Sequence, residues 1–332
     1  MQDTQVAVLS ASQIAALSAT NFSALSTTAI GALDATQLKG VTVTQLKDLS
    51  ATALGALKDT QVPSLSASQI GSLSATNLSA LSATAIGGLD ATQLKGVTTT
   101  QLAGLTGTAL GNLTSTQIGQ LFSSQLAALT VTNLAAIDET QIGGLTTSQI
   151  ASLSSTNLSA LNATSAAALN ATQVGALSVS QLKSLSATDF AELTNTQIGG
   201  FTASQIGALS ATNFSSIDAT GIAGLNTTQV RGLTTTQIAG LSATDFGEFQ
   251  DTHIGALATT QIAALSGTVI TNLTTTNLDS FTATQIAALT TTQIDNLSTT
   301  NISSLDATQL GGFTANQVQS MDAAQVNAYL GY

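Results

Sequence analysis

An eight-residue repeat constrains this chain more than any other feature of its sequence. The octad approximates Leu-Ser/Thr-Ala-Thr-Gln-Ile-Ala/Gly-Ala/Gly and runs 41 times without insertion or deletion over residues 1–328 (41 × 8 = 328). Residues 65–102 repeat residues 9–46 with six changes in 38 positions, which defines a longer unit of 56 residues. Repeat chains grow by stacking each unit on its neighbours. We therefore predict a single repeat array over residues 1–332, with a four-residue tail at 329–332 and no internal domain boundary.

Two columns of the octad are apolar. Position 1 is apolar in all 41 copies and is Leu in 31 of them, and position 6 is Ile, Leu, Val or Phe in every copy except the one with Ala166. The apolar spacing therefore alternates between five and three residues, which fits neither the period of a strand nor that of a continuous helix. Position 6 and the next position 1 are i, i+3 neighbours on one helical face. The pattern indicates short helices that are interrupted once per octad.

Helix start signals recur in the same register. Position 2 is Ser, Thr, Asp or Asn in 36 of 41 copies, which are the residues that cap helix N-termini. Position 5, three residues later, is Gln in 24 copies, so most octads contain a capping box. A small residue at position 8 lets the chain turn. These columns predict one helix of five to seven residues starting near each position 2.

The few charges support helices over strands. Twelve of 17 acidic residues stand at positions 2, 3 or 5, and five of six basic residues stand at position 7, as the helix dipole favours. The predicted fold class is therefore an all-α solenoid of very short helices, one per octad. A β-solenoid stays open as the alternative, because position 4 is Thr or Ser in 39 of 41 copies and Thr is a poor helix former. That column also suggests a hydroxyl contact between adjacent units.

A second period concerns the copies without Gln at position 5. These copies cluster with a mean spacing of 276/10 residues, close to 28 residues or 3.5 octads. One interpretation is a superhelical turn of about 3.5 repeats, with the non-Gln residues on one stripe; the other is that the spacing only records the 56-residue duplication. Under the first, about 12 turns stacked roughly 8–10 Å apart predict an elongated rod of roughly 100–120 Å.

One octad breaks the pattern. Residues 57–64, LKDTQVPS, carry Lys58 at the capping position and Pro63 at position 7. A proline inside a helix removes an i→i−4 hydrogen bond. We expect a local distortion of the helix there.

Composition excludes several classes of function. The net charge is −11 with only six basic residues, which argues against nucleic acid and anionic membrane surfaces as partners. There is no cysteine, so disulfides and thiolate metal sites are excluded. No apolar run approaches the roughly 18 residues of a membrane span, and this segment contains no signal-peptide core. We expect no membrane insertion. Since residue 1 is already in register, the chain fits a segment of a longer array.

The only histidine, His253, is the first candidate for a functional side chain. It stands in the Gln column near Asp251, Glu248 and Asp245, so a metal site is conceivable. One histidine without cysteine is a poor ligand set, and a tolerated polar substitution explains it better. We predict no metal-binding residues and no metal or other cofactor.

Two acidic motifs are the second candidate. SATDFGE (Asp245, Glu248) and SATDFAE (Asp189, Glu192) each place two carboxylates at i, i+3, which could bind calcium or act as acid and base. Surface helix residues are the simpler interpretation. No phosphate-binding glycine loop or Ser/His/Asp set is present, so we predict no catalytic or cofactor-binding residues and no enzyme activity. Phe at position 6, as in Phe190, is interpreted as core.

The octad Leu-Ser/Thr-x-Thr-Gln-Ile/Leu-x-x resembles the short repeats of very long secreted or surface-attached bacterial proteins, the adhesins and haemolysin-type exoproteins. The resemblance covers the whole chain and implies a structural role outside the cell, as a scaffold, spacer or stalk. It carries no functional residues over, and the glycine-aspartate nonapeptides that bind calcium in the haemolysin-type family are absent.

Two further expectations about function and partners follow. The expected partners are the chain itself, by end-to-end or lateral association, or neighbouring segments of a longer array. The alternative function is a binding module that uses the solenoid groove or a regular Thr/Gln face for a peptide, a glycan or ice. Solenoids present extended surfaces of this kind.

Overall fold

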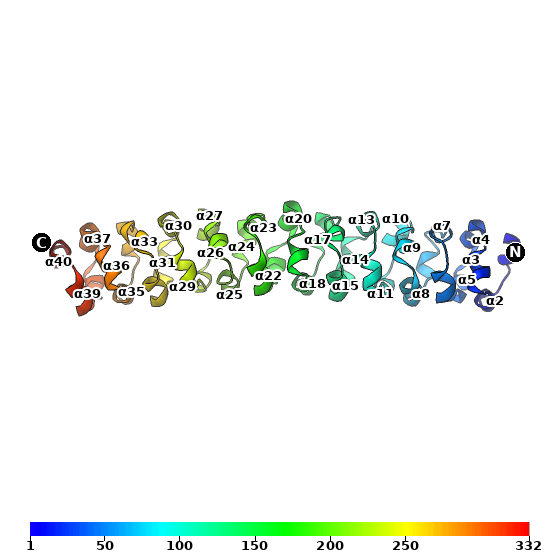
Figure 1. Ribbon diagram of the computed structural model, residues 1–332, viewed down its shortest axis with the longest axis horizontal. Helices are drawn as coiled ribbons and strands as arrows, with labels where there is room; N and C mark the ends of the chain where they lie inside the picture. Colours follow the sequence, from blue (N-terminus) through cyan, green and yellow to red (C-terminus); the bar gives the residue numbers. More distant parts are fainter. Residues whose placement is uncertain (332) are drawn as a thin grey trace. The chain divides into compact units, whose positions relative to one another are not determined.

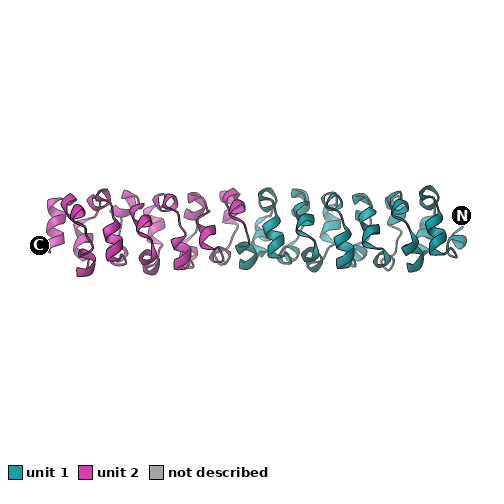
Figure 2. Ribbon diagram, turned by 90° about the horizontal axis from the view of Figure 1, so that it is seen from below, with its two compact units in different colours: residues 1–176 teal, residues 177–332 magenta. Residues whose placement is uncertain are grey.

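The computed structural model describes residues 1–331 and confirms the all-α solenoid. Helix follows helix along the whole of this range, with one helix in each octad, and no strand occurs among the described residues (Figure 1). The β-solenoid alternative is therefore wrong. The chain divides into two compact units, residues 1–176 and 177–332 (Figure 2). The single array without an internal boundary stays a prediction, and so does the rod.

The first unit contains α1 to α21 and one 3-10 helix, η1. Their bounds are α1 Asp3–Val6, α2 Ala11–Ala16, α3 Ala19–Ser23, α4 Thr27–Ala32, α5 Ala35–Gly40, α6 Val43–Lys47, α7 Ala51–Leu54, η1 Val62–Ser64, α8 Ala67–Ser72, α9 Ala75–Ser79, α10 Ala83–Gly87, α11 Ala91–Gly96, α12 Thr99–Ala103, α13 Gly107–Gly111, α14 Ser115–Gln120, α15 Ser123–Ala127, α16 Val131–Leu134, α17 Glu139–Gly143, α18 Thr147–Ser152, α19 Ser155–Leu158, α20 Ala163–Ala168 and α21 Ala171–Gly175.

The second unit contains α22 to α40. Their bounds are α22 Val179–Ser184, α23 Ala187–Ala191, α24 Asn195–Gly199, α25 Ala203–Ile206, α26 Ala211–Ser215, α27 Ala219–Ala223, α28 Thr227–Arg231, α29 Thr235–Ala239, α30 Ala243–Gly247, α31 Asp251–Ala256, α32 Thr259–Ala263, α33 Gly267–Thr271, α34 Thr275–Asp279, α35 Ala283–Ala288, α36 Thr291–Asp295, α37 Thr299–Ser304, α38 Ala307–Leu310, α39 Ala315–Ser320 and α40 Ala323–Leu330.

The capping box starts the helices as predicted. At α8, Ser66 has extended φ/ψ of −72° and 162°, its hydroxyl accepts a hydrogen bond from the Gln69 N–H at 3.3 Å, and Gln69 Oε1 accepts from the Ser66 N–H at 2.7 Å. The chain becomes extended again at Leu73, whose N–H bonds to Ile70 O. Because position 1 leaves the helix in this way, the α-helices are four to six residues long and only α40 has eight, which corrects the predicted five to seven.

The octad with Pro63 is distorted as expected. It forms the 3-10 helix η1 in place of an α-helix, and no side chain caps its start. Gln61 nevertheless accepts from the Lys58 N–H at 2.6 Å, so the Gln column keeps its local role even where the helix is lost.

Position-1 and position-6 side chains form the core of each unit. Ile70, Ile118 and Ile238 are fully buried, and Leu side chains at position 1 pack beside them. Every described position-4 side chain is exposed, and within residues 1–331 none of their hydroxyl groups makes a hydrogen bond. The predicted hydroxyl contact between adjacent units is therefore wrong.

Candidate functional site

The buried Gln side chains at position 5 are the most distinctive polar groups of the structure. Gln101 is representative: its Oε1 accepts from the Thr98 N–H at 2.7 Å, and its Nε2 donates to Leu73 O at 2.7 Å and to Ile70 O at 2.8 Å. These carbonyls lie 28 and 31 residues earlier, at the end of a helix in the preceding turn. One side chain thus caps the start of its own helix and the end of another. We call this array of contacts the amide ladder.

The ladder repeats through both units. Nε2 donates to both carbonyls, 28 and 31 residues earlier, in Gln37, Gln45, Gln61, Gln69, Gln93, Gln101, Gln117, Gln125, Gln141, Gln149, Gln173, Gln237, Gln261, Gln285, Gln293, Gln309, Gln317 and Gln325. The constant separation sets one superhelical turn at 28 residues, or 3.5 octads, as predicted.

Octads without Gln at position 5 form a different face of each unit. Since they recur about every 28 residues and a turn takes 28, they stack on one side, which supports the stripe interpretation. We call them the short face and the Gln-bearing octads the Gln face. Asn is long enough for one carbonyl only: Asn77 Nδ2 donates to Leu49 O at 2.9 Å and Asn157 Nδ2 donates to Leu129 O at 3.0 Å. Ala53 and Ala109 are buried and donate nothing.

His253 takes the place of a ladder Gln. The imidazole is 2% exposed, with Nε2 2.8 Å from Leu225 O and Nδ1 3.3 Å from the Gln250 N–H, and its ring meets Phe249 edge-on. The Nδ1 contact requires an acceptor, so the proton is assigned to Nε2, which donates to Leu225 O. This supports the substitution interpretation. Among residues 1–331, no three His, Asp or Glu side chains are grouped as metal ligands.

The paired acids lie on the short face. Asp189 and Asp245 cap their helices from position 5, where the backbone N–H groups of Ser186 and Ser242 bond to their Oδ2 atoms. Burial first, and the neighbouring carboxylate second, raise the pKa of Glu192 above its usual value, and the same two causes act on Glu248, to which Asp218 also contributes.

Aromatic residues at position 6 are core, as predicted. Phe22, Phe190, Phe214 and Phe246 are almost completely buried. Phe122 is different, because it replaces the capping residue at position 2. Its ring is 50% exposed and Lys95 Nζ lies 5.5 Å from the ring centroid. Sequence reasoning missed it, although an aromatic residue in a capping column was the available signal.

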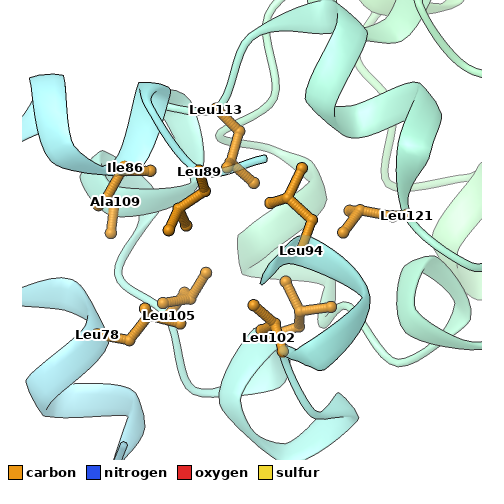
Figure 3. A pocket seen from close by; sticks show the side chains of 10 residues that line it. Leu78, Ile86, Leu89, Leu94, Leu102, Leu105, Ala109, Leu113 and Leu121 are labelled. Atoms are coloured by element: carbon orange, nitrogen blue, oxygen red, sulfur yellow. The ribbon is translucent and has the colours of Figure 1, made fainter. Parts of the chain in front are cut away.

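The interior of the first unit contains one small void. It is lined entirely by apolar side chains, among them Ile86, Leu89, Leu94 and Leu113, which point inward between the helices (Figure 3). Its volume is about 10 Å³. A space of that size holds at most one water and is too small for a ligand, so the void belongs to the core.

The chain matches no protein-family profile and no curated protein. No helix among the described residues is long and apolar enough to cross a membrane.

Proposed function

We propose that the array is a structural scaffold, spacer or stalk segment of a secreted or surface-attached bacterial protein. The observation that carries the proposal is the amide ladder. Its polar side chains point inward and join each turn to the one before it, so the most regular chemistry of the chain is used to hold the repeat together. A role of this kind needs no catalysis, metal or other cofactor.

The resemblance of the octad to repeats of adhesins and haemolysin-type exoproteins supports the extracellular location. The scarcity of charge and the absence of cysteine agree with it. Nucleic acid remains an unsuitable partner in this proposal, because six basic residues among 332 cannot form the clustered positive surface that phosphate backbones require.

A spacer must keep its length, and this can be tested inside the first unit. Thr44, Thr100 and Thr156 are exposed position-4 residues 56 residues apart. Spin labels on a Thr44→Cys/Thr100→Cys chain should lie roughly 20 Å apart, and on a Thr44→Cys/Thr156→Cys chain roughly 40 Å apart, for two and four layers. Narrow distributions in that ratio support the proposal; broad distributions, or equal distances, contradict it.

The binding module remains the second candidate, and the exposed Thr column favours it. Hydroxyl groups at position 4 repeat every octad and have no hydrogen-bond partner within residues 1–331. The Gln half of the expected Thr/Gln face is wrong, because those side chains are buried. Inhibition of ice recrystallisation that is lost when several position-4 Thr residues become Lys would favour this candidate over the spacer.

A further inference from the structure

The amide ladder runs in one direction only. Each Gln donates to carbonyls that lie earlier in the chain, never later, as Gln101 and Gln149 illustrate. Every turn therefore receives donors from the turn that follows it. The first described turn has donors without acceptors, and the last has acceptors without donors.

The donor edge is formed by Gln5, Gln13, Leu9 and Leu17. Oε1 of Gln5 and of Gln13 caps its own helix at 2.8 and 2.9 Å, like the Oε1 atoms of ladder residues. Their Nε2 groups make no hydrogen bond within residues 1–331, and both side chains are exposed, whereas Gln149 is 1% exposed. Leu9 and Leu17 are half-buried here, although the column is buried farther along the unit.

The acceptor edge is formed by Ile302, Leu305, Leu310 and Phe313. Their carbonyl groups accept no side-chain amide within the described chain, in contrast to the equivalent carbonyls of earlier turns. Leu310 and Phe313 are half-buried, and an open hollow of about 430 Å³ lies beside Ile302 and Leu310.

We propose that a second copy of this chain stacks head to tail, with its donor edge on the acceptor edge of the first. Because 41 whole octads fill residues 1–328, a copy that continues the octad count places its Gln5 28 residues after Leu305 and 31 after Ile302. In the same register its Gln13 stands 28 residues after Phe313 and 31 after Leu310. Both spacings are those of the ladder, and both apolar edges become covered.

Such a contact joins two different surfaces, so it leaves one free edge of each kind and permits open-ended filaments. In a longer natural array the preceding octads would fill the same donors within one chain. The inference rests on the proposed scaffold role for its biological use, while its test needs only residues 1–332.

The C-terminal tail competes with the second copy. The helix α40 continues through Tyr329 to Leu330, where other octads have already turned, and the Tyr329 ring packs edge-on against Phe313 with 5.7 Å between centroids. Tyr329 and Leu330 line the hollow at the acceptor edge and occupy the place that Met1 and Gln2 of the next copy would take. The tail must therefore move before the copies stack.

Sedimentation measurements over a range of concentrations test the contact. Deletion of residues 329–332 should strengthen the association constant about tenfold or more. Adding Gln5→Glu and Gln13→Glu should abolish association, because Glu keeps the oxygen that caps its own helix but cannot donate to a carbonyl. Gln120→Glu, at an exposed residue outside both edges, is the matched control and should change nothing. A deletion variant that stays monomeric, or a double-Glu variant that associates equally well, overturns the proposal.

Orientation is tested by fluorescence energy transfer. The chain has no cysteine, so Ser12→Cys and Ala324→Cys, both at exposed position-4 residues, give single labelling sites near opposite edges. Transfer should occur between chains labelled at 12 and chains labelled at 324. Transfer confined to chains that carry the same label would indicate a two-fold contact and overturn the head-to-tail arrangement. A monomer with the spin-label distances expected of a spacer would overturn this inference and leave the proposed function standing.

Discussion

The Gln face and the short face use the same octad in two ways. On the Gln face, the position-5 side chain satisfies two carbonyl groups of the preceding turn, as Gln149 does with Ile118 O and Leu121 O at 2.8 and 2.9 Å. On the short face, Asn157 satisfies one carbonyl and Ala109 none. The difference teaches that helix capping alone cannot explain the Gln column, because both faces cap their helices while only one bonds fully across turns.

Close backbone contacts follow the same division. A Cβ on Gly144, at the end of a Gln-face octad, would stand 2.5 Å from Ser115 O in the preceding turn. Comparable crowding against backbone atoms recurs at Gly71, Gly119 and Gly312, which all belong to Gln-face octads. On the short face, Gly247 has nothing within 4 Å of such a Cβ. The turns therefore approach each other most tightly where the amide ladder is complete.

The largest expected effect comes from removing one ladder donor. Gln149→Glu keeps the oxygen that accepts from the Thr146 N–H but places a buried carboxylate against two carbonyl oxygens. We expect a loss of about 3–5 kcal/mol in the free energy of unfolding of its region, measured by urea denaturation. Gln13→Glu, which has no carbonyl partner, is the control and should change stability little. Equal losses in both variants would remove the distinction between a ladder Gln and a capping Gln.

A smaller loss is expected from closing the tight backbone contact. Gly144→Ala forces a methyl group against Ser115 and should cost roughly 3 kcal/mol. The adjacent Gly143 has nothing within 4 Å, so Gly143→Ala should stabilise the helix end by about 0.5–1 kcal/mol. Thermal unfolding of the two variants should therefore shift in opposite directions. Shifts in the same direction would contradict the close approach.

The origin of the short face is tested by making it resemble the other. Ala109 is 2% exposed, so Ala109→Gln should overpack its site and cost about 1–2 kcal/mol. If the stripe only recorded an eroded duplication, the larger side chain would complete the ladder and raise the melting temperature instead. Gln101→Ala, the opposite change on the Gln face, should destabilise under either interpretation and serves as the reference.

The smallest effect concerns pH. The pKa of Glu248 is raised by burial and by Asp245, so the folded state disfavours its ionised form. The ionised carboxylate therefore costs stability at neutral pH, and this cost disappears as the pH falls through the raised pKa toward 4.5, the ordinary value. Glu248→Gln should be slightly more stable than the unmodified chain at pH 7 and equal to it well below pH 4.5. The gain should shrink in an Asp245→Asn background, and an equal gain there would exclude the carboxylate pair as a cause.

The sequence predicted what depends on neighbours within one octad. Ser66 and Gln69 are three residues apart, so their capping box is visible in the sequence, and the cost of Pro63 to its own helix is equally local. The second role of Gln69, donation to Leu38 O and Val41 O, was missed because those acceptors lie 31 and 28 residues away and are backbone atoms with no sequence signature.

The exposed Thr column marks the opposite failure. A regular column of Thr suggested contacts between units, yet position 4 faces solvent in every described octad. Side-chain identity alone does not distinguish a conserved-looking contact from a conserved-looking surface. The edges could not be found from sequence either, because a free Gln5 and a bonded Gln101 have the same sequence context, and only the direction of the ladder separates them.

The most direct test of the amide ladder is hydrogen exchange of the Gln side chains. With nitrogen-15 placed only in Gln, NMR in deuterated water should separate two classes of Nε2 signals. Ladder amides such as those of Gln101 and Gln149 should exchange slowly, whereas Gln5 and Gln13 should exchange at once, with their signals identified by Gln5→Glu and Gln13→Glu. Uniformly fast exchange of all Gln side chains would contradict a ladder of buried amides that joins each turn to the one before it.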